Sequence, residues 1–153
     1  MGKIVSINVS AGKGTPKSPV EEALLVEDHG IEGDAHAEPG IRQVSLLSFE
    51  SIEESRVRLE EKARKASVAL TPGVFAENIT TEGLDLSAVQ IGTLLQVGEG
   101  VLLRVSKIGK ECHHGCTVFR QVGDCIMPRQ GVFCEVLKGG RIQKGDRIDK
   151  RNG

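Results

Sequence analysis

Short β-rich runs separated by glycines constrain the fold of this chain more than any other feature. They occupy residues 73–80, 92–98, 101–108, 131–138 and 146–150, with the hairpin signals GEG and KGG among them. Residues 3–10, 21–28 and 42–48 carry apolar patterns that predict further strands. Because helices do not alternate with these runs, we predict a mainly β fold, a closed or nearly closed antiparallel or mixed barrel.

One segment has the periodicity of a long α-helix, at about residues 49–65. Its apolar positions lie close to one face and are Phe49, Ile52, Leu59, Ala63 and Ala66. Ser51 with Glu54, or Ser48, is the expected N-cap, and the charged opposite face is interpreted as solvated. A short helical segment is also expected near residues 116–123. Residues 11–19 and 29–40 are rich in Gly and Pro and are predicted to be loops.

Length and composition exclude several classes of protein. A chain of 153 residues is expected to form a single domain over residues 1–153. The net charge of -1 and the absence of Trp and Tyr give no basic field and few aromatic rings for nucleic acid. No apolar run has the roughly 20 residues of a membrane span, and no signal peptide is recognised. We therefore expect a cytoplasmic protein with reduced cysteines, without nucleic-acid or membrane partners.

The stretch GKECHHGC, residues 109–116, places two thiols and two imidazoles directly after a predicted strand. Cys112, Cys116 and one histidine could bind zinc together with Cys125 or Cys134, or the first two cysteines could form a redox pair. A single reactive thiolate is the third possibility. Cys134 is interpreted as a core residue, because strand alternation puts it on the same face as Val132 and Val136.

Several segments together resemble the MOSC domain, named for the C-terminal domain of molybdenum cofactor sulfurase. They are GIEGDAHAEPGIRQVSLLS (30–48), TPGVFAENITTEGLDL (71–86), IGTLLQVG (91–98), GKECHHGC (109–116) and MPRQGVFCEVLKGGRIQKGDRI (127–148). The resemblance implies a barrel of the kind first described in pyruvate kinase. It also implies that Cys112 ligates molybdenum in the pterin cofactor, molybdopterin, or carries sulfur as a persulfide. Pyridoxal phosphate belongs to a separate sulfurase domain and is not expected in this chain.

The candidate site residues follow from this resemblance and from their chemistry. Neighbouring His113 or His114, if protonated, would lower the pKa of the Cys112 thiol and make it more nucleophilic. The expected cofactor-binding side chains are Asp34, His36, Arg42, Gln43, Glu77, Asn78 and Arg129. Arg42 and Arg129 are candidate clamps for the cofactor phosphate, and His36 could orient it or transfer protons. Glu77 and Asn78 could bind a pterin edge or a phosphate tail, although Asn78 as a turn cap and Arg42 as a surface residue remain open.

Three functions are compatible with these observations. The first is a molybdenum-cofactor-binding or sulfur-carrier module, with a cysteine desulfurase or molybdenum cofactor biosynthesis or insertion proteins as partners. The second is a molybdenum-dependent reductase of N-hydroxylated compounds, which would need an electron-transfer partner because the cysteine spacing matches no ferredoxin. The third is a zinc-stabilised interaction domain. We expect the first, with Cys112 as the metal ligand or sulfur carrier.

Overall fold

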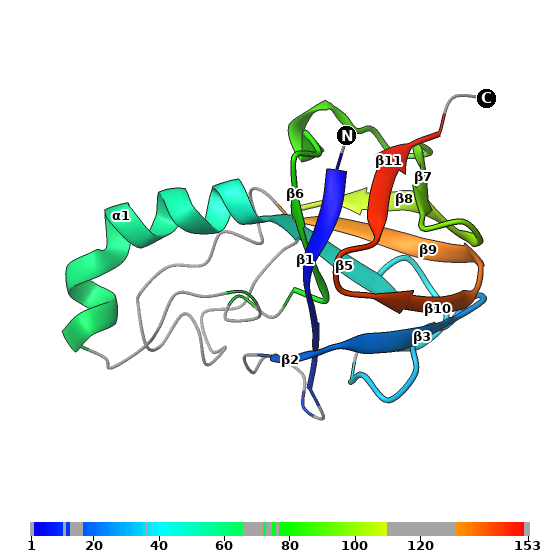
Figure 1. The fold of residues 1–153 in the computed structure, drawn as a ribbon, viewed down its shortest axis with the longest axis horizontal. Helices are drawn as coiled ribbons and strands as arrows, with labels where there is room; N and C mark the ends of the chain where they lie inside the picture. Colours follow the sequence, from blue (N-terminus) through cyan, green and yellow to red (C-terminus); the bar gives the residue numbers. More distant parts are fainter. Residues whose placement is uncertain are drawn as a thin grey trace.

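A computed structural model of the chain describes residues 2–10, 12, 17–35, 37–65, 72, 75, 77–109 and 131–151, apart from the side chains at 58, 59, 62 and 63. The strands in this part of the chain are β1 (Gly2–Val9), β2 (Ser18–Val20), β3 (Glu22–Val26), β4 (Gly30–Ile31), β5 (Val44–Ser48), β6 (Ile79–Glu82), β7 (Leu94–Val97), β8 (Val101–Ile108), β9 (Val132–Lys138), β10 (Gly140–Gln143) and β11 (Arg147–Lys150). The helix α1 spans Phe49–Lys65, and a 3-10 turn, η1, spans Leu86–Ala88 (Figure 1).

Seven of the described strands close into a barrel, which confirms the predicted fold class. Their order is β11-β7-β8-β9-β5-β6-β1, β11 pairs with β1 to close the ring, and β2 extends the sheet from β1. The barrel is mixed, since β5 and β6 are parallel while its other pairs are antiparallel. A smaller sheet, β10-β3-β4, lies beside it (Figure 1).

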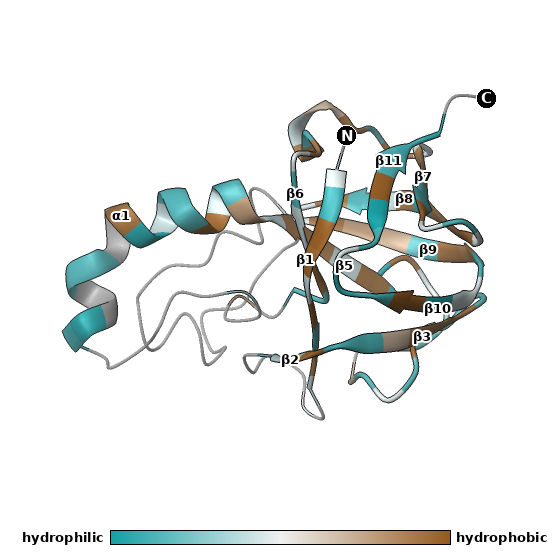
Figure 2. Cartoon of the chain, in the orientation of Figure 1, coloured by the Kyte–Doolittle hydropathy of each residue, from teal (hydrophilic) through white to brown (hydrophobic). Residues whose placement is uncertain are grey.

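The barrel interior is filled by aliphatic side chains from nearly every strand. Ile4, Ile7, Leu46, Ile79, Leu95, Leu103, Val105 and Ile148 are all essentially inaccessible to solvent. Figure 2 shows this apolar character along the strands. Burying each such side chain stabilises the fold by about 1.5–3 kcal/mol before the loss of chain entropy. Cys134 belongs to the same core with Val132 and Val136, as predicted, and burial raises the pKa of its thiol so that it stays protonated.

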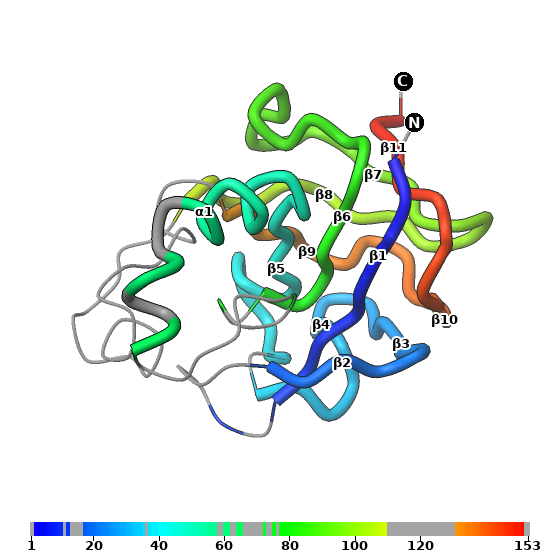
Figure 3. Tube along the Cα trace, turned by 60° about the vertical axis from the view of Figure 1, so that its left-hand side comes forward, coloured from blue at the N-terminus to red at the C-terminus, as the bar shows by residue number. Residues whose placement is uncertain are grey.

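Helix α1 has the predicted bounds, and the structure decides between its two predicted caps. The hydroxyl of Ser48 accepts a hydrogen bond from the backbone N–H of Ser51 at 3.1 Å, so Ser48 is the N-cap. Ile52 and Ser55 are buried, whereas Val57 is exposed. Figure 3 shows the helix leaving the barrel where β5 ends, so its first turns make the contacts that anchor it.

Some predicted strand boundaries are wrong. The run 73–80 was expected to be one strand, yet β6 begins only at Ile79 and Phe75 lies in a turn. At this end of β6 the backbone of Asn78 still bonds Ser45 and Asn8, but the backbone N–H of Ser45 is taken by the Asn78 side chain, which caps the ladder at this point. Strand β10 was missed because KGG was interpreted as a turn. A Cβ at Gly139 would collide with the carbonyl oxygen of Leu25, so glycine permits the close pairing of β10 with β3.

The helical segment expected near residues 116–123 lies outside the described residues. Within the part of the chain that is described, no helix is both long enough and apolar enough to cross a membrane.

Candidate functional site

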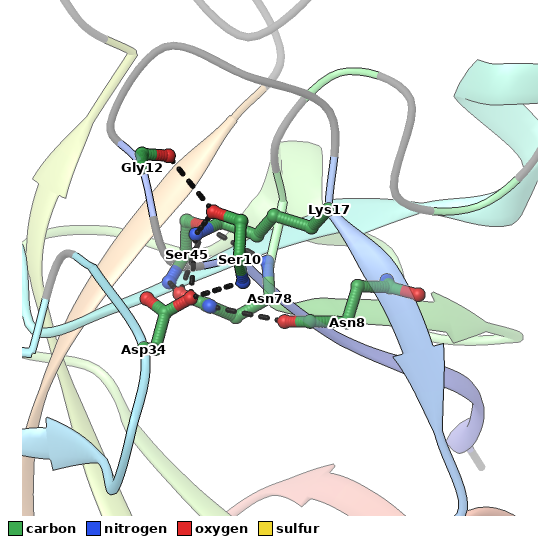
Figure 4. Close-up of polar contacts among 7 residues, drawn as sticks. All are labelled: Asn8, Ser10, Gly12, Lys17, Asp34, Ser45 and Asn78. Atoms are coloured by element: carbon green, nitrogen blue, oxygen red, sulfur yellow. Dashed lines mark hydrogen bonds and ion pairs between the residues drawn. The ribbon is translucent and has the colours of Figure 1, made fainter.

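Four of the predicted cofactor-binding residues are buried, and two of them share one polar cluster. We use the name polar cluster for Asn8, Ser10, Lys17, Asp34, Ser45 and Asn78 (Figure 4). At its centre, the Lys17 ammonium lies 2.7 Å from Oδ1 of Asp34, and both side chains are 0% exposed. The backbone N–H of Ser10 donates to the same carboxylate oxygen at 3.1 Å. The ion pair ties the start of β2, and the Ser10 hydrogen bond ties the end of β1, to the residues that follow β4.

Two opposing effects act on the ionisation of Asp34. Burial alone would raise the pKa of this carboxyl, because it disfavours the charged form. The hydrogen bond and positive charge of Lys17, with smaller contributions from Ser10 and Asn78, outweigh burial and hold the pKa of Asp34 below its ordinary value. Asp34 is therefore an ionised carboxylate whose charge is balanced within the protein.

Asn78 fixes the start of β6 against two other strands. Its Oδ1 accepts hydrogen bonds from the backbone N–H of Ser45 at 2.9 Å and from the Ser45 hydroxyl at 3.2 Å. Its Nδ2 donates to the carbonyl oxygen of Asn8 at 3.2 Å. The amide side chain thus joins β5, β6 and β1, and its hydrogen-bonding groups are directed at the protein itself.

Glu77 lies at one end of a buried chain of hydrogen bonds. Its Oε2 accepts from the Thr80 hydroxyl at 2.8 Å, and Nδ2 of Asn8 donates to the same hydroxyl oxygen at 3.2 Å. The Ser6 hydroxyl in turn donates to Oδ1 of Asn8 at 2.6 Å. The chain crosses from β6 to β1 and is fully enclosed. These hydrogen bonds make the contact between β6 and β1 rigid, because buried polar groups that bond one another favour a single arrangement.

Gln43 and Arg42 are neighbours in the sequence, but their side chains contact different parts of the protein. The Gln43 side chain donates to Oδ1 of Asp28 and to the carbonyl of Gly40, both at 2.9 Å, and accepts from the backbone N–H of Val136 at 2.8 Å. Arg42 is exposed, and its guanidinium carbon lies 5.9 Å from the centre of the Phe133 ring. The structure therefore places Arg42 in a cation–π contact on β9, apart from the polar cluster.

The remaining predicted site residues, His36, Cys112, His113, His114 and Arg129, lie outside the described residues. The structure does describe both ends of the segment that carries the thiol. Ile108 pairs with Val132, and the backbone N–H of Gly109 donates to the carbonyl of Gly131 at 2.7 Å. The described chain therefore stops at Gly109 and resumes at Gly131 at adjacent points of the barrel. Among the described residues, no three His, Cys, Asp or Glu side chains are grouped as metal ligands.

A pocket lies beside this point, at the start of α1. It has a volume of about 670 Å³, and we call it the α1 pocket. Its described lining residues are Ser48, Glu50, Ser51, Gly83, Leu84, Asp85, Leu86, Ser87, Val89, Ile108 and Val132. Leu84, Leu86, Val89 and Val132 are buried and form an apolar floor, while Glu50, Asp85 and Ser87 are exposed at the rim. Pockets of this size and composition are typical of small-molecule sites.

The two carboxylates at the rim are held in place by the turn between β6 and η1. Oε2 of Glu50 accepts from the backbone N–H of Gly83 at 2.9 Å. Oδ1 of Asp85 accepts from the backbone N–H and the hydroxyl of Ser87, and these hydrogen bonds hold the pKa of Asp85 below its ordinary value. Sequence reasoning did not select either residue. The D-x-S spacing of residues 85–87 was the available signal, since it is typical of a capped turn.

Comparison with solved structures supports the observed fold. The crystal structure of the YuaD protein from Bacillus subtilis is similar with a TM-score of 0.71 and 21% identity, over 97% of this chain and 94% of that one. YiiM from Geobacillus stearothermophilus has a TM-score of 0.72 and 22% identity, over 99% of this chain and 76% of that one. YiiM from Escherichia coli has a TM-score of 0.70 and 19% identity, over 99% and 70%.

No curated protein matches this sequence. The family model that does match is that of the MOSC domain, and it covers residues 32–149. This range includes the described strands from β5 to β10, all of β11 but its last residue, helix α1 and the segment that carries Cys112. The chain therefore belongs to the MOSC domain family, which is associated with sulfurase and oxidoreductase functions related to the molybdenum cofactor.

Proposed function

We propose that this protein is a carrier module that holds the molybdenum cofactor, or sulfur destined for it, on Cys112. Membership of the MOSC family is the observation that carries the proposal. The position of Cys112 in the sequence supports it. The cysteine follows Gly109 by three residues, a stretch that spans no more than about 11 Å when fully extended. Gly109 directly follows Ile108, which lines the α1 pocket.

The chemistry of a thiolate suits both kinds of cargo. A thiolate is a soft ligand and therefore binds molybdenum better than a carboxylate would. When bound, the cofactor would supply a metal centre that accepts this ligand. The α1 pocket beside it has the volume and apolar floor needed to cover an organic ring. Cys134 does not compete for this role, because it is a protonated core thiol.

Sulfur loading would be a simple exchange between thiols. The Cys112 thiolate attacks the outer sulfur of a persulfide on a cysteine desulfurase, and a new S–S bond forms. The donor's S–S bond breaks, and the donor cysteine leaves as a thiolate. No external oxidant or reductant is needed, because one persulfide is exchanged for another. The loaded chain would then meet molybdenum cofactor biosynthesis or insertion proteins.

Metal, pterin and sulfur analysis tests the proposal directly. The protein is purified from a host that makes the cofactor, as wild type, Cys112→Ser and Cys134→Ala. We expect wild type and Cys134→Ala to carry molybdenum with pterin, or cyanide-labile sulfur after incubation with a desulfurase, and Cys112→Ser to carry neither. Stoichiometric zinc that survives Cys112→Ala, or a wild type that accepts neither cargo, would contradict the proposal.

A further inference from the structure

We infer that the α1 pocket binds the N–H donor edge of a flat nitrogen heterocycle of the aminopyrimidine type, such as the ring of a pterin, through Glu50 and Asp85. The choice of a pterin-like ligand rests on the proposed function, whereas Glu50 and Asp85 are residues that the sequence did not point to.

The floor of the pocket suits a flat ring. Leu84, Leu86, Val89 and Val132 present apolar surface, and each is less than 10% exposed. Ile108 also lines the pocket and is 46% exposed, so its side chain offers apolar surface to an occupant. A ring seated on this floor would remove the exposed surface of Ile108 from water. The hydrophobic effect therefore favours an organic occupant.

The rim supplies oriented hydrogen-bond acceptors. One oxygen of Glu50 is held by Gly83, and one oxygen of Asp85 is held by Ser87. These bonds orient both carboxylates before a ligand arrives, which reduces the entropy lost on binding. Oε1 of Glu50 makes no hydrogen bond with any described residue, whereas the Asp85 carboxylate also interacts with the backbone N–H of Ala88 and with the charge of Lys150. An ionised carboxylate can only accept, so the matching ligand must present N–H or O–H donors.

The charge at the rim of the α1 pocket determines which part of a cofactor could bind there. Among the described residues, a phosphate would meet two carboxylates and only the one cation, Lys150, that acts on Asp85, so the net charge at the rim would repel it. The amino and ring N–H groups of an aminopyrimidine would instead form charge-assisted bonds. Ile108 is the last residue of β8 before the thiol segment, and Val132 is the first residue of β9 after it. Both line the pocket. A ring held here therefore lies beside the two described strand ends that flank the thiol segment. By contrast, Asp34 and Asn78 are enclosed by their own hydrogen bonds.

Fluorescence titration of the cofactor-free protein with 6-hydroxymethylpterin tests the inference. Glu50→Gln and Asp85→Asn keep one oxygen acceptor each for Gly83 and Ser87 but lose the charge. We expect each to raise the Kd by about tenfold or more, because a charge-assisted hydrogen bond is weakened. Glu53→Gln is the matched control, since Glu53 lies on the same helix, pairs with Arg56 and does not line the pocket. Its Kd should change less than twofold.

The outcomes separate this inference from the proposed function. An unchanged Kd in both Glu50→Gln and Asp85→Asn, with unchanged melting temperatures, would overturn the inference, and so would competition by inorganic phosphate at millimolar concentration. Pterin binding that depends on Glu50 in a protein that never loads molybdenum or sulfur on Cys112 would support the inference while the proposed function fails. Molybdenum loading that needs Cys112 but not Glu50 would do the reverse.

Discussion

Polar residues are buried at one end of the paired strands β5 and β6 and exposed to solvent at the other. At their start, Ser45 and Asn78 belong to a polar cluster that is buried and bonded internally. At their end, Ser48 leads into α1 and Gly83 leads into η1, and the carboxylates nearby stay exposed above an apolar floor. The same two parallel strands thus carry a closed structural anchor at one end and an open pocket at the other.

This difference teaches how to separate structural from functional polar residues in this barrel. A buried polar group is tolerated when its partners lie within the protein, and its loss is then felt as loss of stability. An exposed carboxylate over an apolar pocket contributes little to folding and remains available to a ligand. Substitutions at the two ends should therefore differ first in stability and then in binding.

The largest effect is expected from breaking the buried ion pair. Asp34→Asn should lower the free energy of unfolding by about 3–5 kcal/mol, because it removes the negative charge that lies 2.7 Å from the buried Lys17 ammonium. Urea unfolding followed by circular dichroism measures the change. The double variant Lys17→Met/Asp34→Asn should recover part of the loss. Glu82→Gln removes a surface ion pair, in which the Lys3 side chain is 58% and the Glu82 side chain 43% exposed, and should cost less than about 1 kcal/mol. Equal losses for both pairs would remove the distinction between the two ends.

Asn78→Ala should come next, with a loss of roughly 2–4 kcal/mol. The substitution leaves the backbone N–H of Ser45 and the carbonyl of Asn8 without their side-chain partner in a buried place. The same unfolding measurement detects it. Gln90→Ala, at an exposed amide, is the control and should stay within about 0.5 kcal/mol. A small loss at Asn78 would show that the cluster is not an anchor.

Acid should weaken the anchor through Asp34. The pKa of Asp34 lies below 3.8 in the folded protein, so the folded state binds this proton more weakly than the unfolded state. The contribution is fully present above the unfolded pKa and is lost as pH falls through the folded pKa, hence below about pH 4. Unfolding free energies measured from pH 7 to pH 3 should fall more steeply for wild type than for Lys17→Met/Asp34→Asn. Parallel curves would contradict this.

Loss of the α1 cap should have a moderate effect. Ser48→Ala should lower the free energy of unfolding by about 1 kcal/mol, because the N–H of Ser51 loses its acceptor. Ser48→Asp keeps an acceptor and should restore most of the stability. Thermal melting of the two variants provides the measurement. A larger loss from Ser51→Ala than from Ser48→Ala would mean that the cap is assigned to the wrong serine.

The smallest effect on stability is expected at the pocket rim. Glu50→Gln keeps an acceptor for the N–H of Gly83 at an exposed position, so the unfolding free energy should change by no more than about 0.5 kcal/mol. Its pterin affinity should nevertheless fall, as argued above. A loss of several kcal/mol would place Glu50 with the structural residues of the other end and weaken the comparison.

The elements that sequence reasoning identified well are those whose pattern is local. Helix α1 was predicted with its observed bounds because apolar spacing, a serine cap and charged residues agree over residues 48–65. Cys134 was assigned to the core from strand alternation with Val132 and Val136, which depends on neighbours alone. Strand β6 was predicted to begin too early, at residue 73 instead of Ile79, because β-rich composition cannot show that the Asn78 side chain bonds another strand.

The amino-acid sequence by itself determined the mainly β barrel, the long helix α1 and the family, because these follow from patterns along the chain. The tertiary structure alone decided which polar residues meet. Asn78 bonds Asn8 across 70 positions, and Gln43 bonds Val136 across 93. It also placed Glu50 beside Asp85 at one pocket. The physical reason is that strand order and register, set when the barrel closes, bring distant side chains together, and no local spacing encodes that closure.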